Sequence, residues 1–134
     1  MYEYREFGSE LVEEVKEIYR QEGWFEYLQD DEALVKAYKN SIYCLGTFES
    51  NRLVGFIRCV GDGEHIILIQ DLIISPAHQR RGIGTKLFKM AAEKYSKVRM
   101  FQVNTDIEDE RDNRFYQKMG MKPIIEGDMI SYFR

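Results

Sequence analysis

The stretch from Ile66 to Phe88, IILIQDLIISPAHQRRGIGTKLF, constrains the fold more than any other part of the sequence. An apolar run ends at Ser75-Pro76, a basic loop with two glycines follows, and an amphipathic helix begins after the loop. An apolar run of this kind fits a strand that is covered on both faces. A loop that opens onto a helix N-terminus offers backbone N–H groups and the positive end of the helix dipole. We therefore expect a buried strand, an anion-binding loop and a helix, in that order.

Hydrophobic spacing and turn residues predict alternating strands and helices around this stretch. The expected strands are residues 2–7, 42–49, 53–60, 66–74 and 98–103, with a terminal hairpin of 121–125 and 129–133. The expected helices follow Ser9, Asp30 or Asp31, the glycine loop, and Asp106 or Asp109. The strand–helix–strand segment from 66 to 103 predicts a right-handed crossover. The predicted fold class is α/β, one domain over residues 1–134 with a mixed central sheet of about six to seven strands flanked by about four helices.

Charge is spread unevenly along the chain. The formal net charge is −4, yet residues 75–97 hold six basic residues and one acid, so this segment carries +5 and the rest of the chain −9. An acidic protein with one basic element favours a local anionic ligand over a nucleic-acid surface. A nucleic-acid binder that uses the basic helix is therefore disfavoured, and no nucleic-acid partner is expected.

We expect a cytoplasmic protein without a membrane partner. No apolar run approaches the roughly 18 residues of a membrane span, and residues 1–6 lack the basic and apolar regions of a signal peptide. Cys44 and Cys59 are too few for a disulfide framework and both lie in strand-like runs. Buried free thiols in a reducing compartment are the expected state.

Two common phosphate-binding loops do not fit Gly82-Ile83-Gly84. A Walker loop needs a glycine, four residues and then Gly-Lys-Ser/Thr, a spacing that the sequence lacks. A dinucleotide fingerprint needs Gly or Ala three residues after the second glycine, where this sequence has Leu87. That fingerprint also opens its domain, whereas this loop lies past the middle of the chain.

The loop instead resembles the hallmark of the GNAT superfamily, the acyl-CoA-dependent N-acyltransferases. That pattern is Gln or Arg, two residues, Gly, one residue, then Gly or Ala, and residues 79–84 (QRRGIG) match each defined position. Residues 115–121 (FYQKMGM) resemble the family's Phe-Tyr-x-x-x-Gly-Phe segment, with Met in the last place. The order of expected elements is similar along nearly the whole chain. The resemblance implies a GNAT fold and an N-acetyltransferase that uses acetyl-CoA and no metal.

The resemblance also implies where the cofactor lies. Its pyrophosphate would lie on the loop, with contacts from Gln79, Arg80, Arg81, Gly82, Ile83, Gly84 and Thr85. Its amide-bearing arm would pair with the backbone of Leu72, Ile73 and Ile74 as an added strand does, and a bulge there would aim one amide at the thioester oxygen. Many members carry Asn and Ala seven and four residues before the family's tyrosine. Here Asp109 and Asp112 take those places, and Asn113 is the expected cofactor contact.

The implied chemistry needs an acid and a base. Tyr116 matches the tyrosine that protonates the departing thiolate, and phenol and thiol pKa values of about 10 and about 8.5 make this donation feasible at close approach. Many relatives place a glutamate at or near Gln70, whose amide is a poor proton acceptor. Asp71 is the candidate base, directly or through a water, and an ordered polar residue is the alternative. Strand alternation predicts that Gln70 and Asp71 lie on opposite faces.

The acceptor site is implied to lie on the first two helices and their connector. Trp24, Phe25 and Tyr27 would supply aromatic walls for a small-molecule or peptide amine, and the acids Glu22, Glu26, Asp30 and Asp31 would suit a cation. The alternative is a hydrophobic cover over the sheet. The sequence leaves open the amine, the base, the oligomeric state, for which an exposed terminal hairpin favours a homodimer, and the use of acyl groups other than acetyl. A non-catalytic acetyl-CoA-binding module that acts on a protein partner also stays open, because position 70 lacks a glutamate.

Overall fold

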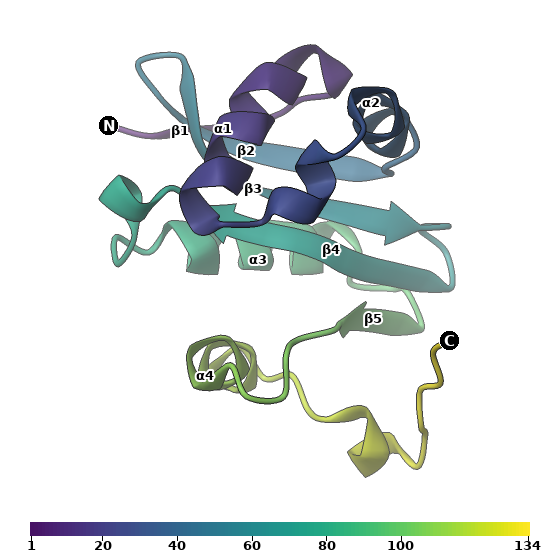
Figure 1. Ribbon diagram of the computed structural model, residues 1–134. Helices are drawn as coiled ribbons and strands as arrows, with labels where there is room; N and C mark the ends of the chain where they lie inside the picture. Colours follow the sequence, from purple (N-terminus) through teal and green to yellow (C-terminus); the bar gives the residue numbers. More distant parts are fainter. The chain divides into compact units, whose positions relative to one another are not determined.

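A computed structural model describes residues 1–134, which form two compact units, Met1–Val103 and Asn104–Arg134. The first unit contains one five-stranded sheet in the order β1-β2-β3-β4-β5 (Figure 1). Neighbouring strands are antiparallel except β4 and β5, which are parallel. The strands are β1 (Glu3–Glu6), β2 (Tyr43–Glu49), β3 (Arg52–Gly61), β4 (Ile66–Ile74) and β5 (Met100–Val103).

Helices cover both faces of this sheet. α1 (Val12–Glu22) and α2 (Asp31–Lys39) lie on one face, with the short 3₁₀ helices η1 (Ser9–Leu11) and η2 (Phe25–Leu28) beside them, and α3 (Ile83–Lys94) lies on the other (Figure 1). η3 (Pro76–His78) links β4 to the loop before α3. The buried side chains of α1 recur at helical spacing and face a core that contains Val12, Val15, Ile18, Tyr19, Leu34, Tyr38, Cys44, Phe48, Leu53, Phe56 and Ile73.

Residues that the sequence marks as helix ends and turns occupy those places in the structure. Gly23 ends α1 in the left-handed region, with φ of 75°. The Asp30 side chain caps α2 by accepting a hydrogen bond from the backbone N–H of Ala33 at 3.1 Å. Ser50 and Asn51 both have positive φ, as a tight β2–β3 hairpin requires. The predicted crossover is confirmed, because β4 and β5 pair in parallel from Ile66↔Met100 onward.

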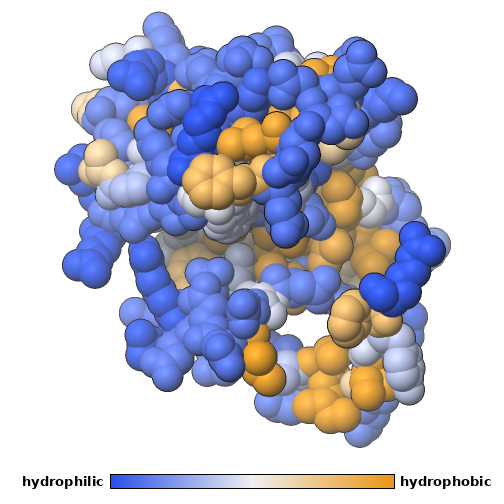
Figure 2. Space-filling view, viewed as in Figure 1, coloured by the Kyte–Doolittle hydropathy of each residue, from blue (hydrophilic) through white to orange (hydrophobic).

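The second unit corrects the predicted number of strands. It contains α4 (Glu110–Lys118) and the 3₁₀ helix η4 (Ile124–Gly127), and residues 121–125 and 129–133 form no hairpin. Pro123 has no N–H to donate, and Asp128 takes a left-handed φ of 59° in the middle of the expected hairpin. The α/β class and the four α-helices are thus confirmed, but the sheet has five strands rather than six to seven. Apolar side chains of this terminal segment are exposed, as the orange surface of Figure 2 shows for the end of the chain.

Both cysteines are free and buried, as predicted. Burial raises the pKa of the Cys44 thiol to about 11 and that of Cys59 to about 12. Neither thiol is therefore ionised to a useful extent near neutral pH. No helix of either unit has the length and apolar character that crossing a bilayer requires.

We predict that Gly61→Ala destabilises the first unit strongly. Gly61 has φ of 136°, and a Cβ there would lie 2.3 Å from the carbonyl oxygen of Ile66, a backbone atom that cannot move aside. The expected loss in the free energy of unfolding, measured in urea, is about 2–3 kcal/mol.

Gly127→Ala is the matched control, because a Cβ at Gly127 would meet no atom within 4 Å. Its effect should stay within about 0.5 kcal/mol. Equal unfolding midpoints for Gly61→Ala and the unchanged protein would contradict the steric argument.

Candidate functional site

The N-terminus of α3 has the chemical features of an anion site. Its first N–H groups have no acceptor within the helix, Gly82 at the N-cap supplies no side-chain hydrogen bond, and the first turn carries no acid. Gly82 has φ of 80°, and nothing lies within 4 Å of the position of a Cβ there. Ile83 is 1% exposed, so its side chain anchors the helix in the core. Gly84 and Thr85 complete the first turn, and both are partly exposed.

Polar contacts fix the loop before this helix. The Gln79 amide donates to the carbonyl oxygen of Ile74 at 2.9 Å and to the carboxylate of Glu22 at 2.7 Å. Arg80 adopts a left-handed φ of 64° and is exposed. The Arg81 guanidinium donates to the hydroxyl of Tyr2 at 2.9 Å, which ties the loop to the start of the chain. The two arginines therefore differ: Arg81 has a protein partner, and Arg80 extends from a strained backbone into solvent.

β4 has an open edge immediately before the loop. Its pairing with β5 covers Ile66 to Ile69, whereas its pairing with β3 continues to Ile74 on the other side. The register with β3 shifts so that Arg58 faces Asp71 while Cys59 faces Ile69, which makes Gln70 the extra residue of a β-bulge. The resemblance implies a bulge at Leu72–Ile74, and the register places it at Gln70 instead. The backbone from Gln70 to Ile74, which includes Leu72 and Ile73, is not paired with β5.

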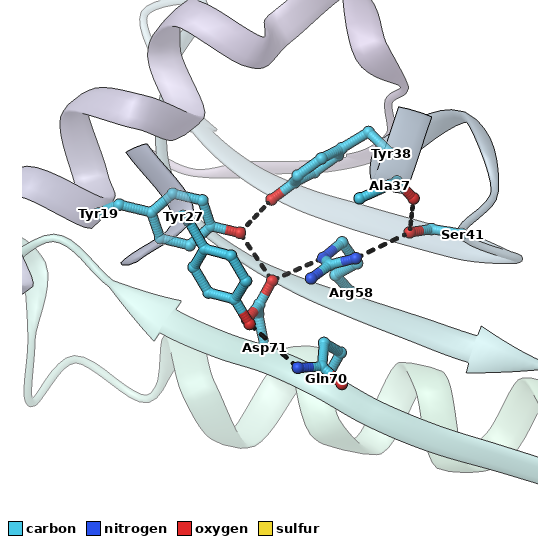
Figure 3. A network of polar contacts seen from close by, with 8 residues as sticks. All are labelled: Tyr19, Tyr27, Ala37, Tyr38, Ser41, Arg58, Gln70 and Asp71. Atoms are coloured by element: carbon cyan, nitrogen blue, oxygen red, sulfur yellow. Dashed lines mark hydrogen bonds and ion pairs between the residues drawn. The ribbon is translucent and has the colours of Figure 1, made fainter. Parts of the chain in front are cut away.

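Asp71 lies at the centre of a buried polar network, which we call the Asp71 network (Figure 3). Its carboxylate accepts hydrogen bonds from Arg58 Nε at 2.6 Å, from the Tyr19 hydroxyl at 2.7 Å and from the Tyr27 hydroxyl at 2.9 Å. The side chains of Arg58 and Asp71 are 5% and 0% exposed. A buried carboxylate with a cation and two hydroxyl donors is fully satisfied.

The hydrogen bonds of this network have a fixed direction. A carboxylate only accepts, so the single proton of Tyr19 goes to Asp71, and Tyr38 must donate to the Tyr19 oxygen, 2.7 Å away. Burial, and secondarily the charge of Asp71, raises the pKa of Tyr19 and of Tyr38, which keeps both hydroxyls protonated. Burial alone would lower the pKa of Arg58, but the Asp71 carboxylate more than offsets this and the net pKa is raised.

The bulge corrects the prediction that Gln70 and Asp71 lie on opposite faces. The Gln70 amide donates to the Tyr27 hydroxyl at 3.0 Å, and the same hydroxyl donates to Asp71 (Figure 3). Regular alternation would separate the two side chains, but the extra residue of the bulge breaks it. Gln70 is exposed and Asp71 is 1% exposed, so the tyrosine links a surface amide to a buried charge.

The aromatic residues between α1 and α2, Trp24, Phe25 and Tyr27, lie in two different environments. Trp24 and Tyr27 both stack on Tyr19, with ring centroids 6.0 Å and 4.6 Å away, and are half-buried. Phe25 is 59% exposed and points away from the core. Of the nearby acids, Glu22 accepts from Gln79, Asp30 caps α2, and Asp31 pairs with Lys16 at 3.1 Å. Much of the expected negative rim is thus already used in local contacts.

The second unit carries the remaining predicted residues. Tyr116 lies on α4, is 8% exposed and contacts the ring of Phe115 edge-on. The Asn113 amide donates to the carbonyl oxygens of Asp106 and Ile107 and accepts from Thr105, which closes the loop that leads into α4. Asp109 caps the helix by accepting from the N–H of Asp112 at 3.0 Å. The cofactor contact of Asn113 and the catalytic role of Tyr116 stay predictions.

Three residues of the Asp71 network, Arg58, Tyr19 and Tyr38, were not among the site residues predicted from the sequence. A signal was present, because Arg58 and Asp71 are single charges of opposite sign in two apolar strands that follow each other along the chain. An unpaired charge is not stable in such a strand. The pairing could have been inferred, but its register depends on the bulge.

The sequence matches the acetyltransferase (GNAT) family over residues 9–121. This chain belongs to that family. The match covers both the glycine loop and the FYQKMGM segment, and it makes the protein a GNAT-type acyltransferase. No curated protein matches the sequence.

Solved structures agree with this assignment. A GNAT-family acetyltransferase from Streptococcus pneumoniae is 30% identical, with a TM-score of 0.86 over 100% of this chain and 97% of that one. The PaiA N-acetyltransferase from Thermoplasma acidophilum, solved with coenzyme A, is 20% identical, with a TM-score of 0.77 over 91% and 90%. An aminoglycoside acetyltransferase from an uncultured soil sample, solved with sisomicin, is 21% identical, with a TM-score of 0.73 over 99% and 95%.

We predict that Asp71→Asn lowers the free energy of unfolding by about 3 kcal/mol, because it leaves the buried Arg58 cation without its counter-charge. The double variant Arg58→Met with Asp71→Asn should recover part of this loss, since no buried charge remains. Urea denaturation followed by circular dichroism measures both.

Arg20→Met is the control for this prediction. Arg20 pairs with Glu17 at 3.1 Å, but both side chains are about half exposed, so its loss should cost at most about 0.5 kcal/mol. A double variant less stable than Asp71→Asn would show that the buried charge is not the cause.

Proposed function

We propose that this protein transfers an acetyl group from acetyl-CoA to a primary amine by direct attack within a ternary complex. One observation carries the proposal: the open edge of β4 from Gln70 to Ile74 leads, through η3 and the glycine loop, to the uncapped N-terminus of α3. The first can pair with an amide-bearing chain, and the second can bind a phosphate. Coenzyme A has both chemical features in one molecule.

The residues of the loop fit a diphosphate. The backbone N–H groups from Arg81 to Thr85 lie at the positive end of the α3 dipole, and no acid in the first turn competes for them. Gly82 leaves open space for close approach, because a Cβ there would meet no atom within 4 Å. Arg80 is exposed beside this site and can add a charge-assisted contact. The coenzyme A complex of the PaiA relative supports the same ligand for this chain.

The edge of β4 fits the amide-bearing arm. The backbone groups of Leu72, Ile73 and Ile74 on the side away from β3 lack a β5 partner. The bulge at Gln70 rotates the backbone just before them, and one amide at this point would stabilise charge that develops on the thioester oxygen, a role typically worth roughly 3 kcal/mol. Acetyl-CoA supplies the activated acetyl group, and the backbone of β4 holds its thioester in position.

Tyr116 is the proposed proton donor to the departing thiolate. It keeps the place in the FYQKMGM segment that the family's tyrosine has, and its phenol is a feasible acid for a thiolate. For the base, Asp71 is the remaining carboxylate, and it reaches the surface through the hydroxyl of Tyr27. The proposed base role of Asp71 is therefore indirect, with Tyr27 between the carboxylate and the amine.

The acceptor is proposed to bind beside Trp24, Phe25 and Tyr27. Trp24 and Tyr27 form a stacked wall on Tyr19, and the exposed ring of Phe25 extends it toward solvent. An aromatic wall suits an amine that carries positive charge elsewhere in the molecule. The aminoglycoside acetyltransferase with bound sisomicin supports an amine acceptor of small-molecule size.

The proposal is tested by free-thiol release from acetyl-CoA with a panel of 1,4-diaminobutane, spermidine, L-lysine, tyramine, kanamycin and an alanine-initiated peptide. Amine-dependent release with at least one of them supports it. Tight coenzyme A binding without release from any of them would favour a binding module instead.

We predict that Gly82→Ala weakens coenzyme A binding roughly tenfold, the value of one charge-assisted hydrogen bond. The new methyl group lies where a phosphate must approach, and the left-handed φ costs only about 1 kcal/mol of stability. Isothermal titration with coenzyme A measures the first effect and urea denaturation the second.

Gly23→Ala is the control for strain, because Gly23 has a similar φ of 75° and a Cβ there would meet only the Phe25 ring, at an ordinary contact distance of 3.9 Å. It should lose similar stability and keep its coenzyme A affinity. Equal coenzyme A affinities of the two variants would show that the loop at Gly82 does not contact coenzyme A.

We predict that Tyr116→Phe lowers kcat at least about 100-fold, the usual value of a positioned general acid, while coenzyme A still binds. Tyr132→Phe, at a tyrosine 88% exposed, should change neither quantity. Thiol-release kinetics and isothermal titration measure the two effects, and normal turnover by Tyr116→Phe would withdraw the acid role.

A further inference from the structure

The bulge of β4 places one more polar group at the proposed acceptor site, the side-chain amide of Gln70. Its nitrogen donates to the Tyr27 hydroxyl at 3.0 Å, and that hydroxyl donates to the Asp71 carboxylate at 2.9 Å (Figure 3). Gln70 itself is exposed, so the other end of its amide faces solvent. The three residues form a chain from a buried charge to the surface.

The direction of every hydrogen bond in this chain follows from its buried end. Arg58 donates to Asp71 at 2.6 Å in a buried ion pair, and an ion-paired carboxylate can only accept hydrogen bonds. The single hydroxyl proton of Tyr27 is therefore used on Asp71. The Tyr27 oxygen can then only accept from Gln70, and the Gln70 amide must turn its nitrogen inward and its carbonyl oxygen outward.

An outward carbonyl oxygen in a fixed orientation is an acceptor for an N–H group. The bulge sets the Gln70 backbone, and the bond to Tyr27 removes the usual freedom of the amide to flip. Gln70 is also the first residue of the β4 backbone that is not paired with β5, beside which the acyl group is proposed to lie. A primary amine that gives one N–H to this oxygen keeps its lone pair free for attack.

We propose that Gln70 binds the acceptor amine through its side-chain oxygen, and that Tyr27 and Asp71, in addition to their proposed base role, act as positioning residues that set the direction of this amide. This inference rests on the proposed acetyl transfer and names the group that holds its acceptor. An amide is a neutral acceptor, so it binds an amine without the added attraction that a carboxylate has for the ammonium form. Gln70 therefore holds the amine while favouring its protonated form less than a glutamate would.

The first arm of the test needs no turnover. In ¹⁵N-labelled protein, the side-chain amide of Gln70 should show one proton shifted downfield and slowed in exchange, because it is hydrogen-bonded to Tyr27. Tyr27→Phe keeps the ring and removes the hydroxyl, so this proton should move to the position of a solvent-exposed glutamine. An unchanged Gln70 signal in Tyr27→Phe overturns the proposed orientation, whatever the enzyme does to amines.

The second arm uses whichever amine of the panel the unchanged protein acetylates fastest. Gln70→Ala should raise the KM for that amine roughly tenfold, the value of one hydrogen bond, with the KM for acetyl-CoA unchanged. Tyr27→Phe should raise the amine KM in the same direction, by a smaller factor. Equal amine KM values for Gln70→Ala and the unchanged protein overturn the inference and leave the proposed function intact, whereas no thiol release by the unchanged protein overturns the proposed function.

Two control variants separate a positioning role from a structural one. Tyr38→Phe removes a hydroxyl from the same buried network, but Tyr38 donates to Tyr19 and makes no hydrogen bond to Tyr27 or Gln70. It should lower stability and leave the amine KM unchanged. Gln29→Ala removes an exposed glutamine that follows η2 and should change neither. An amine KM that rises as much in Tyr38→Phe as in Tyr27→Phe would mean that general loosening is the cause.

Discussion

The ion pair between Arg58 and Asp71 is the interaction on which the rest of the site depends. Two charges inside a sheet are expensive to bury, and they are retained only where hydrogen bonds satisfy both. Here α1 and η2 each supply such a contact to Asp71, through Tyr19 and Tyr27, and the Tyr38 hydroxyl on α2 donates to Tyr19. The pair therefore fixes where both helices and their connector lie on the sheet.

The bulge at Gln70 connects this buried pair to the strand that carries the proposed cofactor site. Before the bulge, β4 is an interior strand, paired on both sides; after it, one side is open. The same extra residue puts Asp71 opposite Arg58 and turns Gln70 to the Tyr27 hydroxyl. A single irregularity in register thus sets the end of the paired region, the position of the charge and the direction of a surface amide. The proposed contacts with the amine and with the acyl donor therefore lie close together in the segment from Gln70 to Ile74.

Much of the fold could be predicted from sequence, because its signals are local. Gly23 and Asp30 mark helix ends through their own backbone and side-chain chemistry, and β4 matches the predicted residues 66–74. The terminal hairpin was wrongly predicted, because alternation describes a strand only when a partner is available, and Pro123 and Asp128 interrupt it. The glycine loop was found through its spacing. The position of the bulge at Gln70, and with it the shared contact of Gln70 and Asp71 with Tyr27, could not be predicted, because register depends on contacts between distant residues.

The open edge of β4 has a consequence for the behaviour of the protein without its donor. An unpaired run of backbone groups on an apolar strand is a template for pairing with another chain. A ligand that occupies this edge both satisfies those groups and binds only the folded state, so it shifts the folding equilibrium by mass action. If the protein has the proposed function, the concentration of acetyl-CoA then sets both the stability of the folded enzyme and its rate of turnover. Depletion of the donor would expose the edge and shorten the life of the protein.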